Sequence, residues 1–394
     1  MSTSALVSFS KLASLEPGSS GAPINAIAFS PDGRLLASGG DDERVRIWKI
    51  STSTCLEVLE ATYELPEEQY GWAQITALRW IICHSGAHLL CIGTGRGLVI
   101  LVHTRGGLFV PEPFKIFPFN DSIESIAYDD INDLLAFSSH SGHIKLCQYD
   151  EEASELVTKW QIYRQTPTIP SSLHFCGDKN KYLLVSWLDI GQISTSDGSK
   201  VWAEHLKGAI GYADLSQDET VLLVHNLNTG SFEVYTYPEA KYSRKLTVPV
   251  SKRVAKQCKV FGTPNSRVAA CGSNDGHVYL FDLQSGAILQ KLFHERGVSS
   301  IQTVASCVKG GTVLLATGSD SESGRIVVWL KSDVTTPPSD VAPRRSNDHR
   351  STEIYIVFVL LFIILMSIWK EHILEAYNIA IPFVQQMTSV WFNT

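Results

Sequence analysis

The sequence predicts an all-β fold: a seven-bladed propeller of four-stranded blades, followed by a linker and one C-terminal transmembrane helix. Three observations predict it. A unit of alternating apolar strands and tight turns recurs seven times, at a spacing of roughly 40 residues. The last unit lacks a strand, while a spare strand precedes the first unit. A long uncharged segment lies near the C-terminus.

The clearest unit, residues 24–50, reads INAIAFSPDGRLLASGGDDERVRIWKI. It contains an apolar strand, a turn, a strand ending in small residues, an Asp-bearing turn, and a strand ending in Trp48. Such a unit cannot bury its own apolar face and needs neighbours on both sides. The other six units begin at Ile75, Ile123, Ser172, Ile210, Cys258 and Val298; the fourth is a weaker copy, and units two, four and five are degenerate.

The two ends of the repeat region explain one another. The seventh unit stops after its third strand, at Trp329 and Leu330, and the orphan strand lies within residues 1–16. If this strand completes the last blade, the ring closes and no sheet edge is left to aggregate. We therefore predict a propeller over residues 1–330, with residues 1–16 closing the last blade.

The motif SPDGRLLASGGDDERVRIW, residues 30–48, closely resembles the WD-repeat family, and SNDGHVYLFDLQSGAIL in the sixth unit is similar to it. The resemblance implies a propeller whose loops bind partners. It also implies a structural hydrogen-bonded set of a turn Asp, a strand Ser or Thr, a terminal Trp and a His. In the first unit these positions are Asp42, Ser38 and Trp48, while the His position falls near Ser20, so the set is incomplete.

Other units carry parts of the same set. Asp275 occupies the Asp position of the sixth unit, where Phe281 replaces the Trp and cannot donate a hydrogen bond. Trp329 ends the seventh unit. The resemblance implies that these residues stabilise the scaffold and carry no chemistry.

Composition and motifs argue against catalysis, cofactors and metals. The net charge of −7 opposes nucleic-acid binding, which needs a basic face. The local basic residues Lys252, Arg253, Lys256 and Lys259 fit a solvated loop and strand edge. Eight scattered cysteines form no CxxC pair, so no zinc site is expected.

Two sequence features could suggest chemistry. The glycine-rich GTGRG, residues 93–97, lies between two strands, whereas a phosphate loop opens into a helix. A Ser–His–Asp set stays open, because its members converge only in space. We predict no enzyme, no cofactor, no metal and no small-molecule substrate.

The C-terminal region changes character twice. Residues 331–353, rich in Pro, Ser, Asp and Arg, predict a flexible polar linker. Residues 354–369 read IYIVFVLLFIILMSIW and carry no charge. A span needs about 20 apolar residues, and Lys370 can extend this one by snorkelling. We predict a transmembrane helix over 354–370; a buried core helix, the alternative, has nothing to pack against. Residues 371–394 form a short amphipathic tail that lies at the far interface or re-enters the membrane.

Flanking charge predicts the orientation of this helix. Arg344, Arg345 and Arg350 precede it, which places the propeller in the cytosol. We expect a tail-anchored protein of the endoplasmic reticulum. The glycosylation sequon at Asn120 should then be unmodified, because its use needs the opposite topology.

Two functions fit a membrane-anchored propeller. The first is a scaffold or adaptor that binds other proteins. The second is guanine-nucleotide exchange on a small GTPase of vesicle budding, because the architecture resembles that exchange-factor family; its Gly-rich, potassium-binding loop has no clear match here.

Candidate partner-binding residues come from two places. The second turns of the units place Arg44, Arg96, His140 and Asn274 on one face, and the insertion between the first two units adds Tyr70 and Trp72. Aromatic residues and Arg are the usual anchors of interfaces. The alternative is that Trp72 packs between blades and the arginines are solvated.

Overall fold

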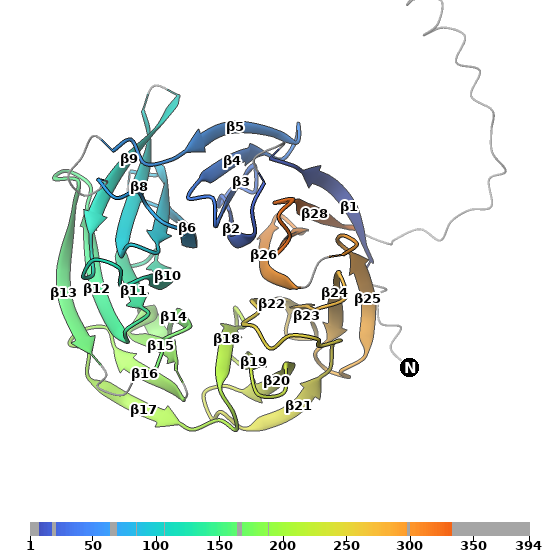
Figure 1. Ribbon diagram of the computed structural model, residues 1–394. Helices are drawn as coiled ribbons and strands as arrows, with labels where there is room; N and C mark the ends of the chain where they lie inside the picture. Colours follow the sequence, from blue (N-terminus) through green and yellow to red (C-terminus); the bar gives the residue numbers. More distant parts are fainter. Residues whose placement is uncertain are drawn as a thin grey trace, which may run out of the picture. The chain divides into compact units, whose positions relative to one another are not determined.

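The computed structural model describes residues 8–17, 21–63, 69–83, 85–105, 107–163, 168–187, 189–297 and 300–332. Within these ranges the chain forms seven four-stranded sheets arranged as a ring, and its one helical element is the 3-10 turn Asp178–Asn180 (Figure 1). The predicted all-β, seven-bladed propeller is confirmed. Blades one to six are antiparallel meanders of four consecutive strands, whereas blade seven combines three consecutive strands with the first strand of the chain.

The first four blades follow the chain in order. Blade one contains β2 (Ile24–Phe29), β3 (Leu35–Gly40), β4 (Val45–Lys49) and β5 (Thr54–Leu59). Blade two contains β6 (Ile75–Ile82), β7 (His88–Thr94), β8 (Leu98–Arg105) and β9 (Leu108–Lys115). Blade three contains β10 (Ile123–Asp129), β11 (Leu134–Ser139), β12 (His143–Asp150) and β13 (Glu155–Tyr163). Blade four contains β14 (Ser172–Cys176), β15 (Tyr182–Ser186), β16 (Ile190–Ser194) and β17 (Lys200–Glu204).

The remaining blades complete the ring. Blade five contains β18 (Ile210–Leu215), β19 (Val221–Asn226), β20 (Ser231–Thr236) and β21 (Tyr242–Leu246). Blade six contains β22 (Cys258–Thr263), β23 (Ser266–Gly272), β24 (His277–Asp282) and β25 (Ile288–Phe293). Blade seven contains β26 (Ile301–Lys309), β27 (Thr312–Ser319) and β28 (Ile326–Ser332), with β1 (Ser8–Leu15) as its outer strand.

Strand β1 closes the ring by pairing antiparallel with β28, from Ser8 opposite Ser332 to Leu15 opposite Ile326. The side chain of Leu15 is fully buried, so the pairing also completes a hydrophobic layer. The amide of Gln290 in blade six holds the other end of β1: Phe9 N donates to Gln290 Oε1 at 2.7 Å, and Gln290 Nε2 donates to Phe9 O at 2.8 Å. The first and last strands of the ring are thereby joined.

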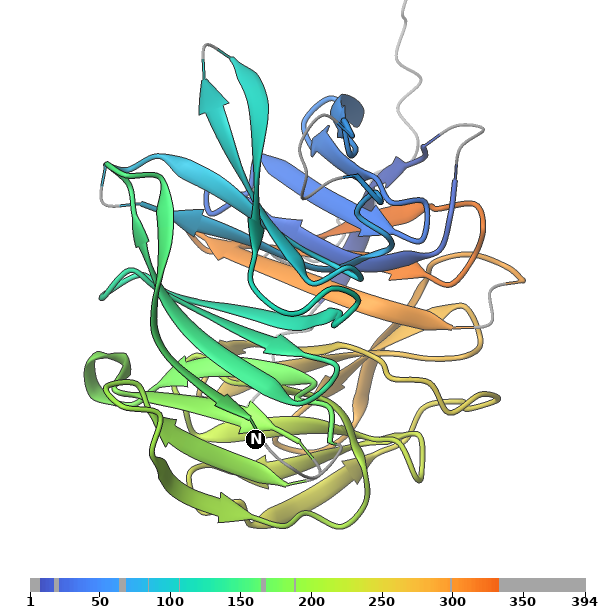
Figure 2. The same cartoon turned by 60° about the vertical axis from the view of Figure 1, so that its left-hand side comes forward.

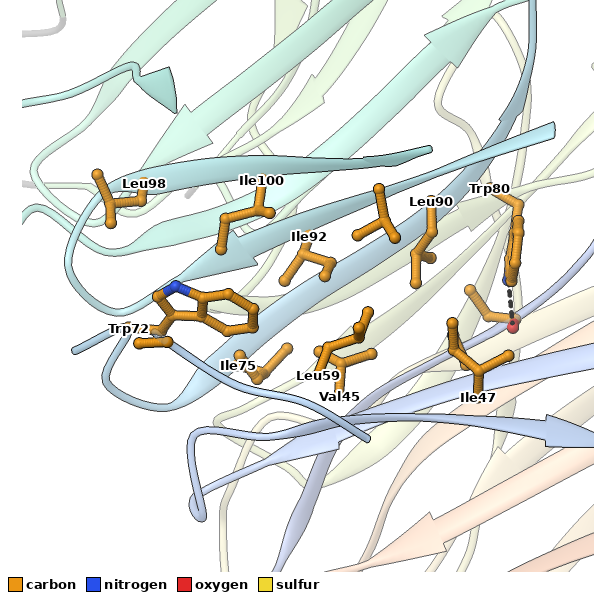
Figure 3. Close-up of a cluster of buried hydrophobic side chains, with 14 residues drawn as sticks. Val45, Ile47, Leu59, Trp72, Ile75, Trp80, Leu90, Ile92, Leu98 and Ile100 are labelled. Atoms are coloured by element: carbon orange, nitrogen blue, oxygen red, sulfur yellow. Dashed lines mark hydrogen bonds between the residues drawn. The ribbon is translucent and has the colours of Figure 1, made fainter. Parts of the chain in front are cut away.

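Apolar layers between neighbouring sheets hold the blades together. Between blades one and two, Val45 and Ile47 of β4 belong to the same cluster as Ile92 of β7 (Figure 3). Trp80 of β6 joins this layer and donates its indole N–H to Ala28 O of blade one at 3.1 Å. Alternation along the strands directs one set of side chains into each layer, which is why the sequence repeats with strand period.

The outer hairpin of blade two projects from the ring. Pairing between β7 and β8 ends at Val102, whereas pairing between β8 and β9 continues to Leu108, and Figure 2 shows this hairpin standing clear of the sheets. Its outer strand contains Pro111 and Pro113, which lack N–H donors. These prolines protect the exposed edge against pairing with another chain.

The elements predicted for the C-terminal region are almost entirely outside the part of the chain that the structure describes. The predicted membrane helix 354–370, the tail 371–394 and all but the first two residues of the linker 331–353 lie outside the described residues. Among the residues that the structure does describe, no helix is long and apolar enough to cross a membrane.

Candidate protein-interaction face

One face of the ring carries the turns between second and third strands together with the connections between blades. This follows from topology, because in a four-stranded meander both lie at the same end of the strands. Hydrogen bonds join them: Gly95 N donates to Gln74 O at 2.9 Å, and Asn120 N donates to Arg96 O at 3.1 Å. We call this side of the ring the connecting face.

An exposed aromatic pair lies on the connecting face at blade two. The rings of Tyr70 and Phe119 meet edge to face, with centroids 5.2 Å apart, and these residues are 59% and 49% exposed. They come from the two connections that flank the blade. Arg96, in the turn between β7 and β8, lies between these connections. We call Tyr70, Arg96, Phe119 and Asn120 the Tyr70 patch.

Arg96 contacts the other three residues of the patch and holds them in place. Its Nη1 donates to Asn120 Oδ1 at 2.8 Å, its Nη2 donates to Tyr70 O at 3.2 Å, and its guanidinium carbon lies 5.2 Å from the centroid of the Phe119 ring. Two hydrogen bonds and a cation–π contact thus tie both connections to one side chain. The arrangement fixes the aromatic pair before any partner arrives, which lowers the entropy cost of binding.

Local backbone geometry explains why Phe119 stays at the surface. Gly97 has φ +83°, and a Cβ there would lie 2.9 Å from both Pro118 O and Asp121 O. The turn and the connection therefore approach as closely as only glycine permits. Phe117, two residues earlier, is buried in the layer between blades two and three and anchors the connection.

The other predicted second-turn residues lie on the same face but in other blades. In blade one, Arg44 Nε lies 2.6 Å from Glu60 Oε2, and the hydrogen bond to this carboxylate raises the pKa of Arg44. In blade three, His140 Nδ1 lies 2.7 Å from Glu124 Oε1. Asn274, in blade six, donates its backbone N–H to Pro249 O at 3.1 Å. Of the predicted partner-binding residues, the structure brings Tyr70 and Arg96 together.

The prediction that Trp72 binds a partner is wrong. Its side chain is fully buried in the cluster between blades one and two, beside Leu98 and Ile75 (Figure 3). The insertion folds back so that its large indole fills the layer, while Tyr70, two residues earlier, stays outside. The alternative reading, packing between blades, is the correct one.

Sequence reasoning missed Phe119 and Asn120. Both belong to the short connection from blade two to blade three, Pro118-Phe119-Asn120-Asp121. An aromatic residue in such a polar turn is the signal that could have found the site, since a connection between blades offers no strand pattern to bury it.

The structural set in blade one is partly as predicted. Trp48 Nε1 donates to Ser38 Oγ at 2.8 Å, and both residues are buried. Asp42 forms an ion pair with the buried Arg46, at 2.6 Å between Oδ2 and Nη2. Ser20, near the expected His position, lies outside the described residues.

In blade six, a tyrosine side chain forms the hydrogen bond to the turn Asp. Tyr279 lies four residues after Asp275 and donates its hydroxyl to Asp275 Oδ2 at 2.7 Å. Arg46 stands in the same relation to Asp42 in blade one. The side chain four residues on therefore fills this role in both blades.

Blade seven contains a His, Thr and Trp set that sequence reasoning missed. His294 Nδ1 lies 2.8 Å from Thr317 Oγ1, and Trp329 Nε1 donates to the same oxygen at 3.3 Å. Burial lowers the pKa of His294 to about 4, so this imidazole is neutral at pH 7. The set was missed because the second turn of this blade is longer, which changes the spacing of the motif. Thr317 precedes Trp329 by 12 residues, whereas Ser38 precedes Trp48 by 10.

A Ser, a His and an Asp do meet in blade three. Ser141 Oγ donates to Asp121 Oδ2 at 2.6 Å, and His143 Nδ1 lies 2.8 Å from Ser141 Oγ and 3.2 Å from Asp121 Oδ2. A catalytic triad needs the imidazole between the other two groups, each on its own ring nitrogen. Here both oxygens face Nδ1, so the cluster ties a turn to a connection and provides no proton relay.

The residues of the other candidate sites have structural roles. The glycine-rich residues 93–97 form the turn between β7 and β8, with no helix to follow. The basic residues do not form a solvated cluster, because Lys256 is fully buried and Lys259 Nζ lies 2.6 Å from Asp214 Oδ1. Within the described ranges, no group of three or more His, Cys, Asp or Glu side chains could hold a metal ion.

Comparison with known proteins agrees with the repeat architecture. Residues 9–49 match the repeat family described as WD domain, G-beta repeat. The chain is 25% identical over 179 residues to Protein HIR2 of Candida albicans, an alignment covering 41% of this chain and 17% of that protein. It is 30% identical over 90 residues to the ribosome biogenesis protein BOP1 homolog of Drosophila ananassae, covering 23% and 11%.

The chain thus spans less than a fifth of the length of these relatives. The repeat match and the seven blades together support a WD-repeat propeller, an architecture suited to protein interaction.

Proposed function

We propose that this WD-repeat propeller is a membrane-anchored scaffold that binds a partner protein through the Tyr70 patch. The observation that carries the proposal is the exposed, edge-to-face pair of Tyr70 and Phe119, braced by Arg96. Tyr, Phe and Arg are enriched in interface cores, and binding energy concentrates on a few such side chains. An apolar or aromatic side chain of the partner would complete the patch.

The membrane part of the proposal rests on sequence. The uncharged residues 354–369, preceded by three arginines, support an anchor that leaves the propeller in the cytosol, at the endoplasmic reticulum. Anchoring raises the local concentration of any partner at that membrane. Fractionation of the full-length chain, with and without alkaline carbonate, tests this part: release by carbonate contradicts an anchor.

Affinity capture with the full-length chain tests the partner-binding part. Three baits are compared: wild type, Tyr70→Ala, and Tyr242→Ala. Tyr242 is a matched control because it is also an exposed tyrosine (54%), but lies on the outer strand of blade five. A stable partner retained by wild type and Tyr242→Ala but lost from Tyr70→Ala supports the proposal. A partner set retained by Tyr70→Ala contradicts it.

The exchange-factor alternative rests on architecture alone. The same capture distinguishes it, because an exchange factor enriches one small GTPase and holds it more tightly without nucleotide.

A further inference from the structure

The inner strands of the blades surround a cavity of about 560 Å³, a volume in the range of small-molecule sites. Strands β6, β14, β18 and β22 lie nearest the axis of the ring in their blades (Figure 1). They contribute polar residues to the cavity wall, whereas the layers between blades are apolar. The polar side chains of this wall on which the inference depends are Arg79, His174, Tyr212, Asp214 and Lys259.

Asp214 and Lys259 form an ion pair in this wall. Lys259 Nζ donates to Asp214 Oδ1 at 2.6 Å, and Asp214 Oδ2 accepts the backbone N–H of Val260 at 2.8 Å. Both oxygens of this buried carboxylate are therefore engaged. The pair leaves Asp214 with little capacity to compensate a second cation.

Arg79 is the second cation. Its side chain is exposed in the cavity wall and makes no hydrogen bond or ion pair with any residue that the structure describes. Burial lowers the pKa of His174, and the positive charges of Lys259 and Arg79 lower it further against the carboxylate of Asp214. His174 therefore stays neutral at pH 7, with Nε2 2.9 Å from Ala213 O.

The remaining carboxylates of the wall lie toward its ends. Glu124 Oε1 contacts the exposed His140 of the connecting face at 2.7 Å. Asp130 is in the exposed turn that follows β10. The Tyr212 hydroxyl makes no hydrogen bond within the described part of the chain, so it is a second available donor beside the guanidinium.

We infer that the central cavity binds a small oxyanion, a phosphate or carboxylate compound, with the Arg79 guanidinium as its main contact. A guanidinium offers two parallel N–H donors that match two oxygens of such a group. Because this guanidinium is exposed in the cavity wall and has no described protein partner, an anion can bind it without displacing another group. The site is separate from the Tyr70 patch and does not depend on the proposed partner.

Calorimetric titration of the purified full-length chain tests this inference, with inorganic phosphate and citrate as probes at constant ionic strength. The variant is Arg79→Gln and the matched control is Arg34→Gln, which removes an 84% exposed arginine outside the cavity. We expect saturable binding of one probe to wild type and control, and a dissociation constant at least tenfold higher for Arg79→Gln. Tighter phosphate binding would identify a phosphate ligand, and tighter citrate binding a carboxylate.

Two results would overturn the inference: no saturable binding of either probe to wild type, or equal affinity in Arg79→Gln. Should Arg79→Gln fail to fold, Arg79→Lys decides the matter. Lysine keeps the positive charge but lacks the two parallel N–H donors of the guanidinium, so we expect several-fold weaker binding. Unchanged affinity would contradict the assigned contact.

Discussion

The indole nitrogen of Trp48 lies 2.8 Å from the hydroxyl oxygen of Ser38 on the adjacent strand, and both groups are buried. This hydrogen bond joins the second and third strands of blade one. Blade seven makes the equivalent link between Trp329 and Thr317. A buried N–H deprived of its acceptor has no access to water, so these links are structural requirements.

We predict that Ser38→Ala destabilises the propeller by about 1–3 kcal/mol, because it leaves the Trp48 N–H unsatisfied. Urea unfolding followed by tryptophan fluorescence measures the change. Ser196→Ala, at an exposed serine, should change stability by less than about 0.5 kcal/mol. Equal effects of the two substitutions would contradict the structural role of Ser38.

Closure by β1 is tested within a single strand. Leu15→Ala should cost about 2–5 kcal/mol, because Leu15 is fully buried where blade seven meets blade one. Leu12→Ala is the matched control, since Leu12 lies on the same strand but is 46% exposed. If β1 did not close the ring, both substitutions would be nearly neutral in thermal unfolding.

The turn beneath the Tyr70 patch depends on Gly97. We expect Gly97→Ala to destabilise the protein by more than about 1 kcal/mol, from strain at positive φ and from a Cβ 2.9 Å from two carbonyl oxygens. Gly107→Ala is the control for the first cause, because Gly107 has φ +84° but no atom lies within 4 Å of the added Cβ, so the difference between the two variants measures the contact. Equal unfolding midpoints for the two variants would show that the contact with the connection is unimportant.

The buried histidines make stability depend on pH. Burial lowers the pKa of His294 from 6.5 to about 4 in the folded chain. Between these values the unfolded state binds the proton and the folded state does not, so stability falls as pH falls from 6.5 to 4. His294→Gln should reduce this slope by up to about 1.4 kcal/mol per pH unit. Urea midpoints between pH 4 and 7.5 test this, and identical slopes would contradict it.

Much of the fold was predictable because propeller blades repeat a pattern that strands enforce. Alternating apolar residues and small-residue turns identified all seven units, including the weaker unit that begins at Ser172 and covers β14 to β17. The site was less predictable. Whether Tyr70 or Trp72 faces solvent depends on how an insertion folds back, which no period in the sequence encodes. Phe119 joins Tyr70 across 49 residues of chain, so its role appears only when the blades are in place.

The most direct test of the central claim is the affinity of the purified full-length chain for the partner obtained by capture. We predict that Tyr70→Ala and Phe119→Ala each weaken binding at least tenfold, as expected for hot-spot aromatics, while Tyr242→Ala binds like wild type. Wild-type affinity in both patch variants, with unchanged folding, would show that the partner binds elsewhere on the ring.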